Sequence, residues 1–590
     1  MARISKAVQE INSLLQPEGL ASFVVNKYVG WRSNRLDWVA SMKELRNYVF
    51  QTDTTQTTNK QLPWKNKTSI PKICQIRDNL HANYFAALFP SDDWFKWDAA
   101  AKDAVSADTA IKIEGYMKQK IRESGFKETI SALLYDYIDT GNAFGEVSYI
   151  SETHTLKDGT SIGVYTGPKA HRISPYDIYF DLSASNFADA GKVTRSVVSM
   201  GTLKKAATES PEFAWVTGGI EQSLALRGSM QAYGGSDIDK AEGIMVDGFG
   251  SLSAYYSSDM VELLEYEGDT FDSETKEIKS NRRIIVMDRK TVVYDEPMES
   301  WLGKTNKEHA GWRPRPDNLL AMGPLDNLVG MQYRIDHLEN LKADVFDQIA
   351  HPVIYQRGVV EDWNWEPGAR IYGDVDSDVR VLAPDTTALN ADFQIQNMMQ
   401  MMEELVGAPK QAMGIRTPGE KTAFEVQALE NNAGRIFQHK IQQFEMGIVE
   451  PLLNQMLESA RRNLTAAEIV KVLDEDAGVA LFMTIQPKDI NSRGKLFPVG
   501  ARHFAKQAQT VQNLLGFINS AAYQDPAVAA HVSGVKIAKL MEENLGLERF
   551  DLVTENIRVA EVQETQKLGT QAQENVASDV MDRNQVDELQ

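Results

Sequence analysis

Residues 325–352 read LDNLVGMQYRIDHLENLKADVFDQIAHP. Apolar side chains recur here every three or four residues, which is the spacing of one face of an α-helix; they are Leu325, Leu328, Met331, Ile335, Leu338, Leu341, Val345 and Ile349. His351-Pro352 ends the pattern, because proline disfavours helical geometry at the residue before it. The spacing predicts a helix of roughly 35 to 40 Å at about 1.5 Å per residue, which is too long for one compact core without neighbours.

The sequence after this helix alternates between β-like and helical patterns. Residues 353–388 are β-like and acidic, with seven acids against three arginines. Helical spacing returns at about 391–405, a Gly- and Pro-rich segment covers 408–421, and a second long helix is predicted over 422–464 with a kink at Pro451. A symmetric ring is a natural way to bury helices of this length, because each subunit packs against the next.

The flanking sequence mixes helices and strands, so the fold class is expected to be α+β. Helical spacing covers 70–88, 110–137, 504–518 and 535–545, and strand-like segments cover 145–150, 162–165, 178–181, 260–266, 283–287, 291–294 and 479–486. Residues 288–290 are predicted to turn between two of these strands. The Gly- and Ser-rich residues 228–258 are typical of a long surface excursion, and the acidic tail 551–590 is predicted to be partly helical and loosely held.

Length and composition exclude several classes of protein. The chain has 590 residues and a mass of 66.0 kDa, enough for roughly two to four domains, and its ordinary globular composition argues against a disordered, collagen-like or disulfide-scaffold protein. The formal charge of −20 disfavours long-range attraction to nucleic acid or anionic lipid. Cys74 is the single cysteine, and no apolar run approaches the roughly 18 residues of a membrane span. We expect a soluble protein made in a reducing cytosol, with no membrane partner.

The sequence contains no complete enzyme motif. GIRTPGEKT (414–422) approaches the phosphate-loop pattern, but Glu420 separates the Gly from the Lys and repels phosphate. DVDSD (374–378) resembles the start of an EF-hand loop, yet Val379 stands where that loop needs Gly; we favour a solvated acidic hairpin over weak metal binding. The His-Glu-x-x-His, Gly-x-Ser-x-Gly and dinucleotide-binding patterns are absent from the sequence. We therefore expect no catalytic residue, no resident metal and no cofactor.

A run of four methionines lies in the predicted helix at 391–405: Met398, Met399, Met401 and Met402. Methionine is flexible and polarisable, so the run could form an adaptable binding face. Packing within the helical core is the other interpretation, and the one we favour.

Several segments, taken in order, resemble the portal, or head-to-tail connector, proteins of tailed bacteriophages, especially those of short-tailed phages. The matching segments are NKTSIPKICQIRDNLHANYFAALF (66–89), DTGNAF (139–144), ISPYDI (173–178), MGPL (322–325) with the long helix ending in HP (351–352), TAFEV (422–426) and EPLLN (450–454). The resemblance covers most of residues 60–520. It depends on the order of the segments and not on any single one.

The resemblance implies a portal-protein fold with wing, stem, clip and crown regions, in which long helices surround the central channel of a ring, usually of twelve subunits. The implied boundaries are wing 1–322, first stem helix 323–350, clip 351–389, second stem helix 390–407, tunnel loop 408–421, long kinked helix 422–464, wing strand return 465–497, and crown with acidic tail 498–590. The Gly/Ser excursion and the extended tail depart from shorter relatives, so the resemblance assigns neither of them a role.

The function implied is a channel at one capsid vertex, through which terminase packages double-stranded DNA and from which the DNA is later ejected. The implied partners are further copies of the chain, the DNA, the terminase large subunit, head-tail adaptor and tail proteins, and the major capsid and scaffolding proteins. The implied locations are the portal vertex of the virion and, during assembly, the host cytoplasm. An acidic channel suits this role, because strong neutralisation of phosphates would slow the sliding of DNA.

The resemblance also points to two groups of candidate site residues. The tunnel loop would be DNA-proximal through three cations opposed only by Glu420, namely Lys410, Arg416 and Lys421; pairing with acids of a neighbouring subunit is the alternative. The clip would contact the motor or adaptor through acids and two tryptophans, namely Glu361, Asp362, Trp363, Trp365, Asp374, Asp376 and Asp378. For each acid a solvated surface position is the alternative.

Two other classes of function stay open at this point. One is a metal-dependent nuclease or ATPase of the DNA-packaging machinery, with Asp374 and Asp376 binding magnesium; the missing phosphate loop argues against it. The other is a soluble scaffold without a DNA channel.

Overall fold

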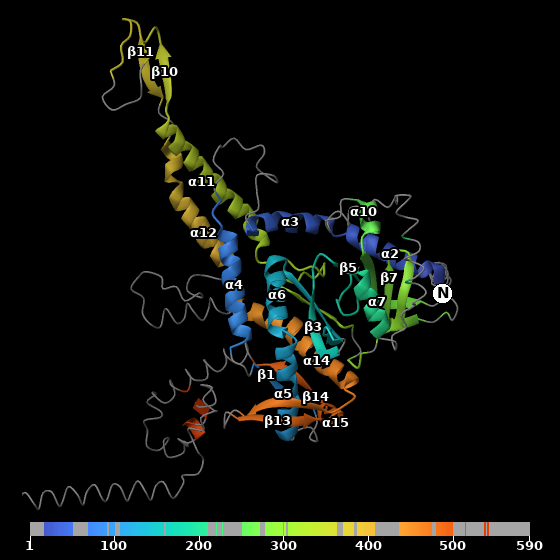
Figure 1. Cartoon of the computed structure of the whole chain (residues 1–590). Helices are drawn as coiled ribbons and strands as arrows, with labels where there is room; N and C mark the ends of the chain where they lie inside the picture. The colour runs from blue at the N-terminus through green and yellow to red at the C-terminus, as the bar shows by residue number, and fades with distance from the viewer. Residues whose placement is uncertain are drawn as a thin grey trace, which may run out of the picture. The chain divides into compact units, whose positions relative to one another are not determined.

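The computed structural model is α+β, as the sequence predicts (Figure 1). The residues it describes are 17–50, 69–90, 94–100, 107–158, 161–209, 220, 227, 251–271, 276, 278–298, 300–302, 305–362, 370–382, 386–406, 436–474, 479–499, 514, 536–538 and 540–541. The chain divides into two compact units, residues 1–470 with 483–501 and residues 471–482 with 502–590. Most of the second unit, including the tail predicted at 551–590, lies outside the described residues.

A five-stranded antiparallel sheet forms one layer of the first unit. Its strands follow the order β4 (Ile178–Phe180), β5 (Lys192–Ser199), β6 (Met260–Phe271), β7 (Ile278–Met287) and β8 (Thr291–Pro297). The tight turn between β7 and β8 places Asp288 and Arg289 at positive φ, which confirms the hairpin expected there. Helix α2 (Pro17–Ser33) packs on the sheet through Val24 and Tyr28.

A three-stranded sheet, β3 (Ser161–Ile173), β2 (Asn142–Thr155) and β9 (Lys307–Gly311), forms a second layer. Helices α6 (Phe126–Asp139) and α14 (Glu450–Asn463) contact β2 and β3. The helix predicted over 110–137 is two helices, because the chain breaks at Gly125 (φ +68°) between α5 (Ala107–Glu123) and α6. A left-handed backbone is easy for glycine and ends the first helix.

The second predicted long helix enters the described residues at residue 436. It is α-helical over 436–444, π-helical over Glu445–Val449 and α-helical again in α14. The irregularity therefore precedes Pro451, which has no N–H to donate to the carbonyl four residues before it. A Cβ at Gly447 would lie 2.9 Å from the Ala310 Cβ, so the π turn brings this helix close to β9.

Two antiparallel helices and a hairpin form the remaining large feature of the first unit. Helix α11 (Val329–Ala350) leads into β10 (Val353–Arg357), which pairs with β11 (Asp378–Leu382), and α12 (Asp392–Val406) returns beside α11 (Figure 1). These four elements confirm the helix, β and helix order predicted for residues 325–405. We call them the arm, and the rest of the first unit the body.

Shorter elements complete the described structure. They are α3 (Leu36–Phe50), α4 (Lys72–Leu88), α7 (Met200–Glu209), α10 (Leu252–Ser257), α15 (Pro487–Ile490), the antiparallel pair β1 (Phe95–Ala99) and β14 (Gly494–Pro498), and the pair β12 (Glu468–Asp474) and β13 (Val479–Ile485). Helix α4 and strand β13 agree with the sequence prediction. Helix α10 lies inside the predicted 228–258 excursion, of which residues 228–250 lie outside the described residues.

Candidate functional site: the arm and its root

The hairpin of the arm exposes apolar side chains on both of its faces. All five residues of β10 are exposed. Val353 pairs with Leu382 in the strand register, and Ile354 pairs with Val381, so adjacent apolar pairs point to opposite faces. All four of these side chains are exposed, Val353 to 65%. A two-stranded sheet is marginal in water by itself, so these exposed apolar side chains make the hairpin a candidate contact surface.

Four of the five acidic candidates lie beyond the β10–β11 pair, where the chain continues as a second short ladder, and the fifth, Asp378, is the first residue of β11. Val360 bridges Gly373, and the Glu361 amide donates to the Tyr372 carbonyl at 3.0 Å. The acids at positions 361, 362, 374 and 376 are exposed. Asp378 is half-buried and pairs with Arg380 at 2.6 Å.

Part of the predicted site lies outside the described residues. This applies to both tryptophans of the clip, Trp363 and Trp365, and to the three tunnel-loop cations, Lys410, Arg416 and Lys421. The imperfect phosphate loop at 414–422 lies outside them as well. The DVDSD segment is described, and it forms a turn leading into β11 instead of a loop between two helices. Over the described part of the chain, no group of three His, Cys, Asp or Glu side chains could hold a metal ion.

The arm is anchored to the body just before and at the start of α4. The Ile70 amide and the Ser69 hydroxyl donate to the Asp336 carboxylate of α11 at 3.0 and 3.1 Å. Gln332, one turn earlier, donates to the Ile70 carbonyl at 2.6 Å. Burial raises the pKa of Asp336, although the hydrogen bonds from Ile70, Gln332 and Ser69 oppose that rise. We call this junction of α4, α11 and α12 the root of the arm.

An ion pair between α4 and α12 forms the other half of the root. The Lys72 ammonium lies 2.5 Å from the Glu403 carboxylate, and the two side chains are only 9% and 5% exposed. Lys72 also donates to Gln75 at 3.1 Å. Both ends of the pair are buried, so losing either partner would leave a costly unpaired charge.

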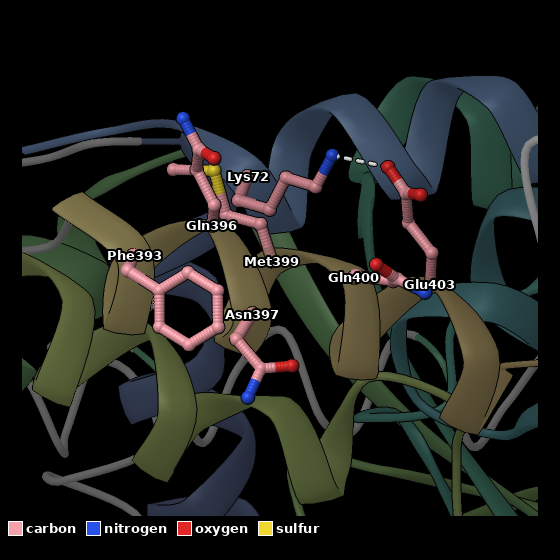
Figure 2. Close-up of a pocket in the computed structure, with 7 residues that line it drawn as sticks. All are labelled: Lys72, Phe393, Gln396, Asn397, Met399, Gln400 and Glu403. Atoms are coloured by element: carbon pink, nitrogen blue, oxygen red, sulfur yellow. Dashed lines mark hydrogen bonds and ion pairs between the residues drawn. The ribbon is translucent and has the colours of Figure 1, made fainter. Parts of the chain in front are cut away.

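A cavity of about 610 Å³ lies against this ion pair (Figure 2). Figure 2 shows the ion pair at one end, the Phe393 ring at the other and the amides between them; the lining residues are Lys72, Phe393, Gln396, Asn397, Met399, Gln400 and Glu403. The methionines of this run differ in their surroundings. Met402 is fully buried, Met399 lines the cavity and Met401 is 47% exposed. Core packing, the favoured interpretation, therefore accounts for Met402 and not for Met401.

Two of the segments that carried the resemblance meet where the chain leads into α11. Gly141 and Asn142 of DTGNAF lie against residues 321–323, which begin the approach to α11. The Asn142 side chain accepts from the Ala321 amide and donates to the Ala321 carbonyl, both at 2.9 Å. A Cβ at Gly141, where φ is +72°, would lie 2.4 Å from the Gly323 nitrogen. Only glycine fits such a close approach at this backbone angle.

Sequence reasoning did not single out Lys72, Asp336 or Glu403, which join the arm to the body, or Asn142, which fixes the residues that lead into α11. Their partners lie far away in the chain: Lys72 and Glu403 are 331 residues apart, and Asn142 and Ala321 are 179 apart. The one available signal was that Lys72 and Asn142 fall within the segments that resemble portal proteins. Neither a protein-family model nor a curated protein sequence matches the chain.

Among the residues that the structure describes, no helix is both long and apolar enough to cross a bilayer.

Proposed function

We propose that the chain is a portal subunit of a tailed bacteriophage. In this proposal copies of the chain form a ring at one capsid vertex, and double-stranded DNA passes through the central channel during packaging and ejection. The arm would supply stem and clip: α11 and α12 as the two stem helices and β10–β11 as the clip. The location would be the virion, and the host cytoplasm during assembly.

The observation that supports the proposal most is the construction of the arm. A body with its own buried core carries two paired helices and a hairpin that has exposed apolar residues on both faces. Such a hairpin gains from neighbours at its sides, and a head-to-tail contact repeated around an axis closes into a ring. The order of helix, hairpin, returning helix and long helix is the order that the resemblance implies for a portal.

The charge of the chain agrees with the same role. A formal charge of −20 per copy makes the assembled wall repel DNA phosphates, which keeps the duplex mobile. The cations Lys410, Arg416 and Lys421 would then be the local contacts with DNA at the tunnel loop. The exposed acids at the far part of the hairpin would face basic surfaces of terminase, the adaptor or the tail.

Electron microscopy of the purified full-length protein tests this proposal. Rings with a central hole, resolved as a single symmetric class, are the expected result. A persistent globular monomer at micromolar concentration would refute the proposal. Magnesium-dependent DNA cleavage or ATP hydrolysis by the same preparation would point instead to an enzyme of the packaging machinery.

A further inference from the structure

Helix α12 has a surface that a solvent-facing helix does not normally have. Residues 393–402 read FQIQNMMQMM and contain no charged side chain. Only part of this stretch is used internally: Ile395 and Met402 are buried, whereas Phe393 is 78% exposed. Exposed helix faces are ordinarily charged. The exposed side chains of this stretch are amides, one methionine and one phenylalanine, and an uncharged exposed face of this kind is instead typical of a face that another protein surface covers.

The cavity beside this face has the chemistry of a protein contact. Among the described lining residues the one cation, Lys72, is already neutralised by Glu403, so these residues offer no free positive charge to a phosphate. The remaining lining consists of amides, which can both donate and accept, and of Phe393 and Met399. These groups suit an uncharged or aromatic protein surface more than nucleic acid.

The other helix of the arm carries a surface that matches this cavity. On α11 the rings of Tyr333 and His337 are stacked, with centroids 6.4 Å apart, and both are half-buried. Arg334 next to them is exposed. The residues of α11 that pack inward are Gln332, Ile335, Asp336, Leu338 and Asn340. Helical spacing of 100° per residue therefore places Tyr333, Arg334 and His337 toward the outer side of α11.

The two surfaces lie at the same level along the arm. Lys342 of α11 and Asp392 of α12 form an ion pair at 2.7 Å, which sets the register of the antiparallel helices. Arg334 is eight residues before Lys342, and Gln400 is eight residues after Asp392, so both lie about 12 Å from this pair in the same direction. Glu404, one turn beyond Gln400, is exposed and accepts a hydrogen bond from the Gln400 amide.

We propose that the cavity at Lys72 and α12 is a socket for the outer face of α11 of a second copy of the chain, with the Tyr333–His337 stack against the socket and Arg334 facing Glu404. This inference depends on the proposed function, because arms meet at one level when copies stand side by side around a ring axis. Socket and inserting face belong to different helices, so the contact is head-to-tail and repeats from copy to copy. The charges also match, with a cation on one face and an acid on the other.

Charge exchange tests the contact. Arg334→Glu and Glu404→Arg each place like charges together, and each is expected to weaken ring assembly about tenfold in the association constant per contact. The double variant Arg334→Glu/Glu404→Arg restores the opposite charges and should recover assembly. Both residues are exposed, so circular dichroism should show all three variants folded. Arg315→Glu is the matched control, since exposed Arg315 pairs with Asp317 of its own chain at 2.6 Å and should leave assembly unchanged.

Photo-crosslinking identifies the occupant of the socket directly. The photoreactive residue p-benzoylphenylalanine replaces Gln396, unlabelled and heavy-isotope-labelled protein are mixed before assembly, and the crosslinked peptides are read by mass spectrometry. Mixed-isotope crosslinks to α11 support the socket. Crosslinks within one chain, for example to residues 51–68 or 407–435, or crosslinks to another part of the second copy, overturn it.

The outcomes separate the two proposals. If Arg334→Glu and Glu404→Arg each form rings as well as the wild type does, the socket is wrong and the portal proposal is unaffected. A wild-type protein that never assembles overturns both.

Discussion

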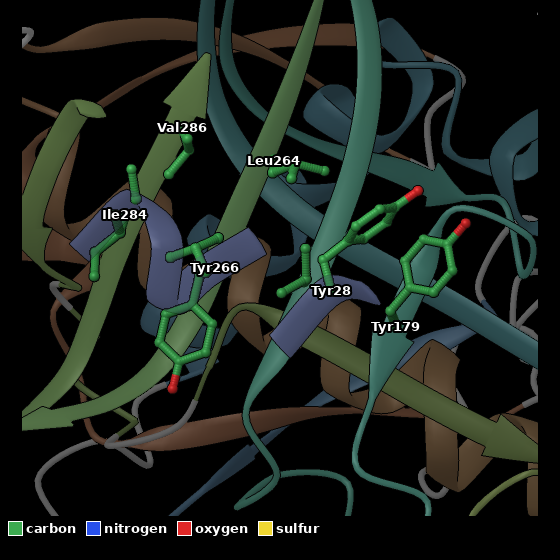
Figure 3. Close-up of a cluster of buried hydrophobic side chains, with 9 residues drawn as sticks. Tyr28, Tyr179, Leu264, Tyr266, Ile284 and Val286 are labelled. Carbon is green, nitrogen blue, oxygen red and sulfur yellow. The ribbon is translucent and has the colours of Figure 1, made fainter. Parts of the chain in front are cut away.

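The body buries apolar side chains and charged groups inside one chain, whereas the hairpin of the arm leaves both kinds exposed. In the body, α2 and the five-stranded sheet enclose an apolar cluster in which the Tyr28 and Tyr179 rings pack edge to face at 4.8 Å (Figure 3). The Lys307 ammonium, fully buried nearby, lies 2.9 Å from Glu267 and 3.2 Å from Glu265. In the arm hairpin, apolar side chains are exposed and the Asp378–Arg380 pair lies at the surface.

This difference indicates which region is complete in one chain. A buried charge network is tolerable only when each member has partners, and the body supplies them from β6 and β9. An exposed two-stranded sheet lacks the third strand or covering layer that such sheets need. The body can therefore be tested by its own stability, whereas the proposed role of the hairpin is tested by binding measurements.

The largest expected effect is at the contact between Gly141 and Gly323. Gly141→Ala places a Cβ 2.4 Å from the Gly323 nitrogen at φ +72°, and we expect a loss of about 4 kcal/mol or more in the free energy of unfolding. Urea denaturation followed by circular dichroism measures it. Gly330→Ala is the control: no heavy atom lies within 4 Å of a Cβ there, and alanine in α11 should stabilise by up to about 1 kcal/mol. Equal effects of the two changes would contradict the close approach.

The next largest effect is at the ion pair of the root. Lys72→Met leaves Glu403 buried without its partner, and we expect a loss of about 3 kcal/mol in the free energy of unfolding. Lys72→Met/Glu403→Met removes both charges and should recover most of that loss, because apolar replacement of a buried pair is often neutral. Lys342→Met breaks a pair whose Asp392 side chain is 64% exposed, and it should cost less than about 1 kcal/mol. A double variant as unstable as the single one would show that the charges themselves hold the root.

A smaller effect is expected from acid. Burial lowers the pKa of His309 to about 3, and the ring stacks on Phe144 and lies 3.0 Å from the Asn142 side-chain oxygen. The unfolded chain takes up this proton near pH 6.5. The stability that neutral His309 contributes is thus fully present above about pH 6.5 and falls as the pH drops toward 3.

Protonation of His309 in the unfolded chain sets the size of the expected pH effect. Between about pH 6.5 and pH 5 the proton on unfolded His309 removes about 1.5 kcal/mol from the free energy of unfolding. His309→Phe keeps an aromatic ring against Phe144 and should reduce the pH dependence by that amount. Thermal unfolding of both proteins over this interval provides the measurement, and parallel curves would argue against a neutral buried His309.

The parts of the fold that the sequence predicts are those with local periodicity. The apolar spacing of α4, α11 and α12 and the turn at 288–290 are each contained within a short stretch, and all are confirmed. The pairings of β2 with β9 and of β1 with β14 join segments far apart in sequence. They depend on three-dimensional complementarity, which no periodicity records. For the same reason the sequence does not predict the contacts of the root, because neither Lys72 nor Glu403 belongs to a recognisable pattern.

The smallest expected effect on stability is at the far part of the hairpin. A loss of binding there without a loss of stability would distinguish the arm from the body. Asp374→Lys/Asp376→Lys changes two exposed side chains, so the free energy of unfolding should change by less than about 0.5 kcal/mol. If these acids face basic surfaces of terminase or the adaptor, the same change should abolish that binding at low salt, because like charges would then meet. Asp98→Lys/Asp317→Lys alters two exposed acids of the body and should leave the binding intact. Unchanged affinity in the hairpin variant, measured by pull-down against purified terminase and adaptor, would exclude the acids from the contact and leave the exposed apolar side chains of β10 and β11 as the candidate contact surface among the described residues of the hairpin.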